Sequence, residues 1–168
     1  MPVEIERKFF VADPSWREHA DDGVLIRQSY LATNGHASVR VRIRGDGKAT
    51  LTVKLPGSGL SRLEFEYDIP ADEAEVLMRV RQGGLVEKTR YRVTVAGMVW
   101  EVDVFSGEND GLVIAEIELE QEDQPFARPA WLGPEVTGDE RYHNSRLAQR
   151  PFASWSSAPL GQELVQAE

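Results

Sequence analysis

Residues 4–8 read Glu-Ile-Glu-Arg-Lys, close to the start of this 168-residue chain. Side chains two residues apart share one face of a β-strand. Glu4, Glu6 and Lys8 therefore lie on one face of a predicted strand, and Ile5 lies on the opposite face. The stretch thus predicts a strand that presents two carboxylates and one cation to the same side.

The same period-two alternation recurs along most of the chain and predicts eight strands. The alternating segments are 3–11, 24–32, 38–45, 48–55, 61–69, 85–96, 98–105 and 112–121. Several are separated by turn residues, such as the Gly-Asp-Gly at 45–47. Eight strands with short connections predict a mainly β (α+β) fold, a closed eight-stranded antiparallel β-barrel or tunnel.

Helices are expected to be few and to cover the barrel. Capping and turn residues predict them at Pro14–Ala20, at Pro70–Gln82 with an end at Gly83-Gly84, and at about 144–149. The length suits a single domain. We expect this domain to span residues 1–152 and residues 153–168 to form a C-terminal tail that could be flexible.

Charged residues keep to one face of the later strands as well. Periodicity alone favours an ordinary solvated sheet face. However, Arg and Glu dominate this face, with cations concentrated in 38–55 and 88–92 and carboxylates in 4–6 and 101–120. If the face turns inward, seven cations would repel one another unless a polyanion joined them, and Arg forks suit phosphate oxygens. They are Lys8, Arg40, Arg42, Lys54, Arg62, Lys88 and Arg90.

The carboxylates on this face suggest a metal site. Glu4, Glu6, Glu116 and Glu118 would form an all-oxygen site for a hard cation, Mg²⁺ or Mn²⁺. A divalent cation beside a cationic phosphate site is typical of phosphoryl transfer. Structural ion pairing with the arginines is the alternative explanation for Glu116, Glu118 and Glu120.

Composition restricts the remaining possibilities. A net charge of −9 argues against nucleic-acid binding. There are no cysteines, and the three histidines lack ligand spacing, so thiolate chemistry is excluded and zinc is not expected. The start lacks the apolar region of a signal peptide, and no apolar run reaches membrane length. We expect a cytoplasmic protein that makes no membrane contact; a homodimer remains open.

Residues 4–9 also resemble the ExExK signature of the CYTH superfamily, the triphosphate tunnel metalloenzymes. Later segments resemble the family in the same order, and the resemblance covers roughly residues 2–150. These segments are 28–31, 39–42, 52–54, 60–66, 86–91, 101–105, 115–119 and 136–144. The short bacterial group that cleaves inorganic tripolyphosphate is the most similar part of the family.

The resemblance implies a β-tunnel in which the seven cations hold a linear triphosphate and Glu4, Glu6, Glu116 and Glu118 face the metal. It places Asp103 near a second metal or the attacking water. Tyr30 matches a tyrosine of the short bacterial members, although an ordinary strand aromatic is an equal alternative. Tyr30, Asp103 and Lys88 are the expected catalytic residues.

The expected reaction is metal-dependent hydrolysis of inorganic triphosphate, a small-molecule polyphosphate, to pyrophosphate and phosphate. Relatives that share the tunnel suggest two enzymatic alternatives, a class IV-type adenylate cyclase and a thiamine or nucleoside triphosphatase. A non-catalytic polyphosphate- or nucleotide-binding module is the alternative from another class. The sequence has no obvious motif for reading a base, and a binder would not need the paired carboxylates.

Overall fold

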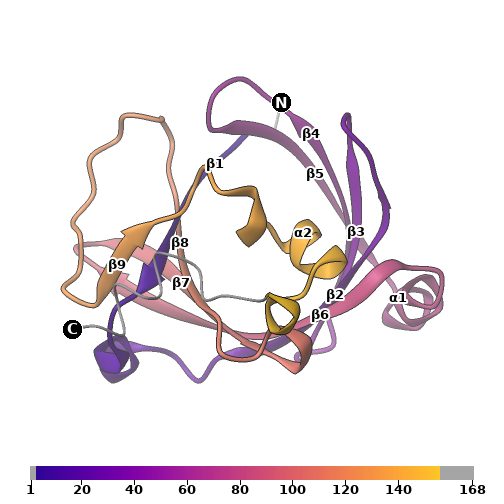
Figure 1. Cartoon of the computed structure of the whole chain (residues 1–168), viewed down its shortest axis with the longest axis horizontal. Helices are drawn as coiled ribbons and strands as arrows, with labels where there is room; N and C mark the ends of the chain where they lie inside the picture. The colour runs from indigo at the N-terminus through magenta and orange to yellow at the C-terminus, as the bar shows by residue number, and fades with distance from the viewer. Residues whose placement is uncertain (1–2, 156–168) are drawn as a thin grey trace.

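The computed structural model describes residues 3–155 and contains nine strands. They are β1 (Val3–Val11), β2 (Val24–Thr33), β3 (Ser38–Arg44), β4 (Ala49–Pro56), β5 (Ser61–Ile69), β6 (Gln82–Val95), β7 (Met98–Ser106), β8 (Val113–Glu118) and β9 (Leu132–Glu135). The sheet order is β5-β4-β3-β2-β6-β7-β8-β1-β9, all neighbours are antiparallel, and a β5–β1 pairing closes the first eight into a ring (Figure 1). The predicted closed eight-stranded barrel is confirmed.

The ninth strand was not predicted, and it creates a divided seam along β1. One edge of β1 pairs with β5 at Val3–Ile5 and then with β9 at Phe9–Val11. β9 approaches β1 closely, because a Cβ on Gly133 would lie 3.0 Å from the Phe10 carbonyl oxygen. The short strand also contains Pro134, which sheets tolerate at an edge. The ring therefore changes partner midway along the strand that carries Glu4, Glu6 and Lys8.

The helical segments are short. They comprise the α-helices α1 (Ala71–Met78) and α2 (Asn144–Gln149) and the 3-10 segments η1 (Pro14–His19), η2 (Gly107–Asn109), η3 (Glu140–Tyr142) and η4 (Phe152–Ser154). The predicted helix end at Gly83-Gly84 is wrong: α1 stops at Met78, and both glycines belong to β6. Here glycine permits a close approach, because a Cβ on Gly83 would lie 2.6 Å from the Ala148 carbonyl oxygen of α2.

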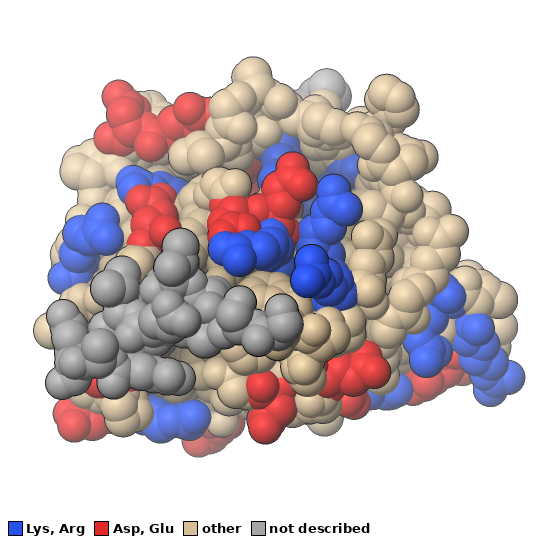
Figure 2. Space-filling model, viewed as in Figure 1, with Lys and Arg blue, Asp and Glu red and all other residues tan. Residues whose placement is uncertain are grey.

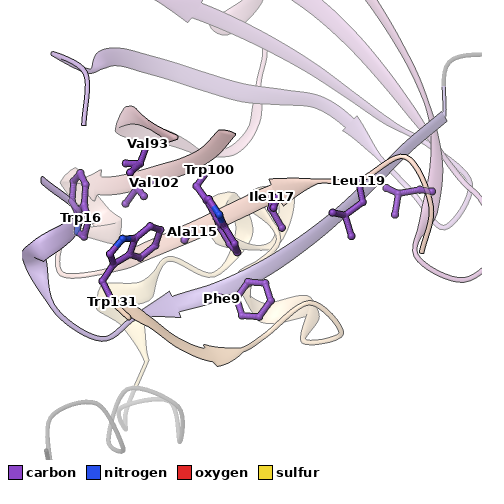
Figure 3. Close-up of a cluster of buried hydrophobic side chains, with 10 residues drawn as sticks. Phe9, Trp16, Val93, Trp100, Val102, Ala115, Ile117, Leu119 and Trp131 are labelled. Carbon is purple, nitrogen blue, oxygen red and sulfur yellow. The ribbon is translucent and has the colours of Figure 1, made fainter. Parts of the chain in front are cut away.

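The apolar strand face points outward and is covered, as the inward-facing charges require. On one side, Phe9, Trp100 and Ile117 are fully buried with Trp131 and with Trp16 of η1 (Figure 3). The Trp100 ring lies 5.6 Å from the Phe9 ring and 5.7 Å from that of Trp131. These edge-to-face contacts and the burial of large rings stabilise the outer layer.

α1 covers another part of the outer face. Its Ala74 and Met78 are buried against Val41 and Ile43 of β3 and Ala49 of β4. Val41 and Ile43 alternate along β3 with Arg40 and Arg42, so the apolar and the charged side chains lie on the two different faces of the strand. The contacts with α1 hold the apolar side chains of β3 outward and therefore keep Arg40 and Arg42 facing inward.

The interior of the barrel is not charged throughout. Phe10, Phe105 and Ile114 share the inward parity but are buried against Tyr142 and Leu147. Residues 140–149, which comprise η3 and α2 and are called the plug below, lie inside the ring in projection (Figure 1). The plug fills one end of the barrel with apolar contacts and leaves the charged interior beside it.

The end of the described chain packs on the plug. The Trp155 ring lies 5.5 Å from the Tyr142 ring and 5.1 Å from that of Phe152. Residues 153–155 thus contact the domain, whereas the rest of the predicted tail, 156–168, lies outside the described residues. No helix within residues 3–155 has the length and apolarity needed to cross a membrane.

Candidate active site

A cavity of about 250 Å³ opens inside the ring beside the plug. It brings together seven residues that the sequence singled out: Glu4, Glu6, Lys8, Tyr30, Arg40, Lys54 and Arg62. In projection, acidic and basic side chains gather around the opening of the ring, with uncharged residues around them (Figure 2). The predicted inward charged face is therefore correct, and residues from β1 to β5 share one enclosed space.

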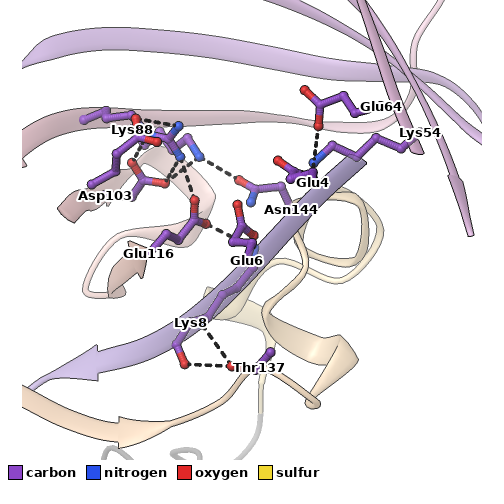
Figure 4. Close-up of polar contacts among 12 residues, drawn as sticks. Glu4, Glu6, Lys8, Lys54, Glu64, Lys88, Asp103, Glu116, Thr137 and Asn144 are labelled. Carbon is purple, nitrogen blue, oxygen red and sulfur yellow. Dashed lines mark hydrogen bonds and ion pairs between the residues drawn. The ribbon is translucent and has the colours of Figure 1, made fainter. Parts of the chain in front are cut away.

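Deeper in the barrel, Asp103 of β7 organises an ion-pair network (Figure 4). Its side chain is fully buried and accepts hydrogen bonds from Lys88 Nζ at 2.6 Å and Arg90 Nε at 2.7 Å. Arg90 also pairs with Glu116 at 3.0 Å and with Glu101 at 3.1 Å. Register explains this arrangement, because Arg90 lies directly opposite Asp103 in the β6–β7 hairpin.

The network continues to the first strand through Glu116. Lys8 Nζ lies 3.1 Å from Glu116 and 3.2 Å from Glu6 (Figure 4). The pKa of the Glu116 carboxyl is lowered well below its usual range because the attraction of Lys8, Arg90 and Lys88 outweighs the opposing effect of burial. Glu116 is therefore ionised and held by cations.

Glu118 lies in the opposite electrostatic environment. Burial and the nearby Glu4 and Glu6 carboxylates raise its pKa, with Glu101 and Glu64 adding to the effect. Three cations serve these carboxylates: Lys54 is shared between Glu4 at 2.6 Å and Glu64 at 2.8 Å, Lys8 pairs with Glu6 and Arg90 pairs with Glu101, while Lys8 and Arg90 also bind Glu116. Like-charge repulsion shows that this end has more negative charge than its cations neutralise.

This excess fits the predicted divalent cation. Within residues 3–155, no three acidic or histidine side chains are already arranged as a metal centre. The fit therefore rests on donor chemistry, since Glu4, Glu6 and Glu118 supply hard oxygen ligands whose mutual repulsion a cation would relieve. Glu116 differs from them because Lys8 and Arg90 already occupy its oxygens.

Positive charge is in excess along β3. Arg40 lies 3.6 Å from Glu66, a carboxylate whose side chain is 45% exposed, and Arg42 donates to the neutral Gln28 amide at 3.0 Å. Burial, followed by repulsion from Arg40 and Arg90, lowers the pKa of Arg42 to about 9, so it stays protonated at neutral pH. An anion is the natural counter-charge here.

Lys88 is a buried amine of this network whose pKa is lowered. Its side chain is fully buried, and its Nζ also donates to the Asn144 side chain of the plug at 3.1 Å. Burial lowers the pKa of Lys88 to about 7, against the opposing attraction of Asp103. An amine with such a pKa can exchange a proton near neutral pH.

No site role was predicted for Thr137, which precedes the plug, or for His143 and Asn144 of the plug, although all three line the cavity. Thr137 also binds the first strand, because the Lys8 backbone N–H donates to its Oγ1 at 3.0 Å (Figure 4). Burial lowers the pKa of His143 to about 4, with Lys8 and Arg62 adding to the effect. The only signal was the family resemblance of 136–144, because this segment has no strand alternation.

Fold and site together define a class, the β-tunnels whose interior sets cations and carboxylates around one enclosed space. A family model identifies the particular family within this class. The model described as the CYTH domain matches residues 2–150, so this chain belongs to the CYTH family.

Two relatives are described as inorganic triphosphatases. The one from Acetivibrio thermocellus is 49% identical over 156 residues, which cover 92% of this chain and 99% of the relative. The one from Nitrosomonas europaea is 43% identical over 151 residues, covering 87% and 97%. A crystal structure of an inorganic triphosphatase is 37% identical, with a TM-score of 0.62 and coverage of 88% of this chain and 95% of that chain. The similarity thus extends over almost the whole length of each protein.

Proposed function

We propose that this protein is a divalent-metal-dependent triphosphatase that hydrolyses inorganic triphosphate to pyrophosphate and phosphate. The observation that carries the proposal is the shared cavity, where Lys8, Arg40, Lys54 and Arg62 meet Glu4 and Glu6. Cations suit the phosphate oxygens, and carboxylates suit the cation that accompanies a polyphosphate. The two full-length relatives described as inorganic triphosphatases support the same activity.

The dimensions of the cavity favour an inorganic substrate over a nucleotide or thiamine ester. Its volume of about 250 Å³ is below the range of about 300–1,000 Å³ typical of pockets for drug-sized ligands. Its lining contains no Phe or Trp, and the rings of Tyr30 and His143 are the two on which a base could stack. A short phosphate chain needs neither the extra volume nor an aromatic platform.

In the proposed reaction, water adds to a terminal phosphorus and pyrophosphate leaves. Lys8, Arg40, Lys54 and Arg62 would bind the chain and, with Arg42 and Arg90, stabilise the charge that develops on the transferred group. Asp103 would hold Lys88 and Arg90 in position through its three hydrogen bonds. Lys88 would exchange a proton at Nζ with the attacking water or the leaving oxygen. Tyr30 remains a candidate for orienting the substrate.

We propose Mg²⁺ or Mn²⁺ as the cofactor, held by Glu4, Glu6 and Glu118, with Glu116 joining if Lys8 turns to the substrate. The bound ion would neutralise phosphate oxygens and make the phosphorus more open to attack. The excess negative charge around Glu118 supports this assignment.

One assay separates the proposal from its alternatives. The purified protein is incubated with tripolyphosphate, ATP and thiamine triphosphate, with and without Mg²⁺ or Mn²⁺, and orthophosphate, pyrophosphate and cyclic AMP are measured. We expect metal-dependent release of phosphate and pyrophosphate, with tripolyphosphate the preferred substrate. Cyclic AMP as the main product would identify a cyclase, and binding without turnover would identify a non-catalytic module.

Glu118→Gln tests the metal assignment. Removing one carboxylate charge should lower metal-dependent turnover at least 100-fold and shift the Mg²⁺ titration to higher concentration, because charge count sets cation affinity. Circular dichroism should report an unchanged fold. Glu120→Gln is the matched control, since Glu120 is exposed and lies outside β8. Full activity in Glu118→Gln would show that the metal is misplaced.

A further inference from the structure

Gln28 is a fully buried amide on the inward face of β2, and neither a catalytic nor a ligand-binding role has so far been given to it. We infer that Gln28 is a positioning residue for Arg42: its neutral oxygen fixes the guanidinium without neutralising it, so that Arg42 keeps its charge for a substrate phosphate. This inference rests on the proposed function.

The geometry places the two side chains together. Gln28 lies directly opposite Arg42 in the β2–β3 register, and Arg42 Nε donates to Gln28 Oε1 at 3.0 Å. One guanidinium edge is thereby fixed, while Arg42 remains partly exposed within the barrel. A single neutral acceptor thus orients Arg42 and leaves its charge for another partner.

The other enclosed cations form ion pairs with carboxylates, which Arg42 does not among the residues that the structure describes. Lys88 and Arg90 share Asp103, Lys8 pairs with Glu116, and Lys54 pairs with Glu4 and Glu64. Arg42 forms no ion pair within residues 3–155. Arg62 also has no such pair in that range, but it is exposed on the rim and can be solvated. Arg42 therefore combines enclosure with an uncompensated charge.

Two further donors point to a missing acceptor on the same wall. Gln28 Nε2 and Arg40 Nε are buried, and neither has a hydrogen-bond acceptor in the described part of the chain. An unsatisfied buried donor is costly, and such groups recur where a ligand binds. A phosphate provides several acceptor oxygens together with the counter-charge that Arg42 lacks. The hydrogen-bond donors and the positive charge of the β2–β3 wall would thus be better satisfied with an anion bound than in the ligand-free protein.

The decisive variant is Gln28→Glu, which adds a charge at nearly constant shape. If Gln28 leaves Arg42 uncompensated, a glutamate should raise the melting temperature of the ligand-free protein by forming the absent ion pair. It should also raise the Kd for tripolyphosphate at least tenfold, because the substrate must displace a carboxylate. Calorimetry without divalent metal, where no turnover is expected, gives the Kd, and kinetics with Mg²⁺ should show KM rising more than kcat falls.

Two other variants serve as controls. One tests whether the packing of Gln28 explains the result, and the other tests whether the added negative charge acts regardless of its position. Gln28→Met keeps the volume but loses the acceptor, so it should lower the melting temperature and weaken binding less than Gln28→Glu does. Gln121→Glu adds the same charge at an exposed position and should leave both the melting temperature and the Kd at wild-type values.

Opposite results would overturn the inference. Wild-type affinity in Gln28→Glu would show that Arg42 needs no free charge. Equal losses of stability and affinity in Gln28→Glu and Gln28→Met would make Gln28 a packing residue. Tight binding of tripolyphosphate by the wild type without turnover would refute the proposed function alone, because the ratio of Kd values would still decide the role of Gln28. No binding by the wild type would overturn both.

Discussion

The wall formed by β6–β8 and the wall formed by β3–β5 both carry alternating charges. They differ in how far these charges are neutralised by ion pairs within the wall. On β6–β8, the Lys88–Asp103 pair is fully buried at 2.6 Å, with Arg90 and Glu116 bound to it. On β3–β5, Lys54 pairs with Glu64 at 2.8 Å, but Arg40 pairs at 3.6 Å with a half-exposed Glu66, and Arg62 lies at the rim. Similar strand patterns thus give one wall that is held by its own ion pairs and another that is left for a ligand.

The difference has a physical origin. Buried charges without partners are expensive, so the wall that lies deepest must compensate itself. A wall that opens into the cavity can leave charges to water in the empty protein and to phosphate in the complex. The compensated wall should therefore govern both folding and activity, whereas the open wall should govern binding.

The largest effect should come from breaking the compensated wall. Asp103→Asn leaves Lys88 and Arg90 buried without their main counter-charge, so we expect a loss of about 3–5 kcal/mol in the free energy of unfolding. Turnover should fall below detection. Urea denaturation and phosphate-release assays measure the two losses. A fully stable Asp103→Asn protein would contradict the account of this wall.

A change on the open wall should separate binding from folding. Arg62→Met removes a rim cation that has no ion pair within the described residues, so stability should change by less than about 0.5 kcal/mol. The KM for tripolyphosphate should rise about tenfold, as expected for one lost charge-assisted contact. Arg79→Met, which removes an exposed cation at the end of α1, is the matched control and should leave KM unchanged.

His143 of the plug lies beside the β1–β5 join and should give the smallest effect, one that depends on pH. It faces Lys8 of β1 and Arg62 of β5, with Glu140 of η3 opposing them. Its pKa is about 4 in the folded protein against 6.5 for an ordinary histidine, so between these values the unfolded chain binds a proton that the folded protein does not. Its contribution to stability is complete above pH 6.5 and is lost as the pH falls towards 4.

His143→Asn should therefore flatten the decline of the melting temperature between pH 6.5 and 4. Thermal melts of the variant and wild type across this range measure the difference, and the two should behave alike above pH 7. An identical slope in both proteins would mean that the environment of His143 does not disfavour its protonation.

Strand parity allowed much of this fold and site to be predicted from the sequence. A period of two fixes which side chains share a face, and the predominance of Arg and Glu on that face favoured an inward orientation over an ordinary solvated face. The sequence could not give the pairing within that face. Glu116 and Glu118 have the same parity, yet one is bound to cations and the other lies among carboxylates.

The helix at 144–149 was predicted, but it was expected to cover the barrel, whereas α2 packs inside it; the strands contained a signal for this plug. The inward parity changes from charged to apolar at one end of several strands, as at Phe10 after Lys8 and Phe105 after Asp103. Apolar side chains inside a barrel need an apolar partner, so these positions mark the end that the plug fills. β9 was missed for another reason, because four residues that include a glycine and a proline carry no periodicity.

The divided seam of β1 makes the joins between strands unequal around the barrel. β1 joins β5 through only three residue pairs, Val3–Leu63 to Ile5–Ser61, whereas the β6–β7 hairpin has nine. The seam is therefore the join of the ring with the fewest paired residues, and we expect the circumference to widen there most easily, without disturbing the compensated wall. Because Glu4 and Arg62 are register partners across that join, a metal-facing carboxylate and a rim cation lie on the two strands that such widening would separate.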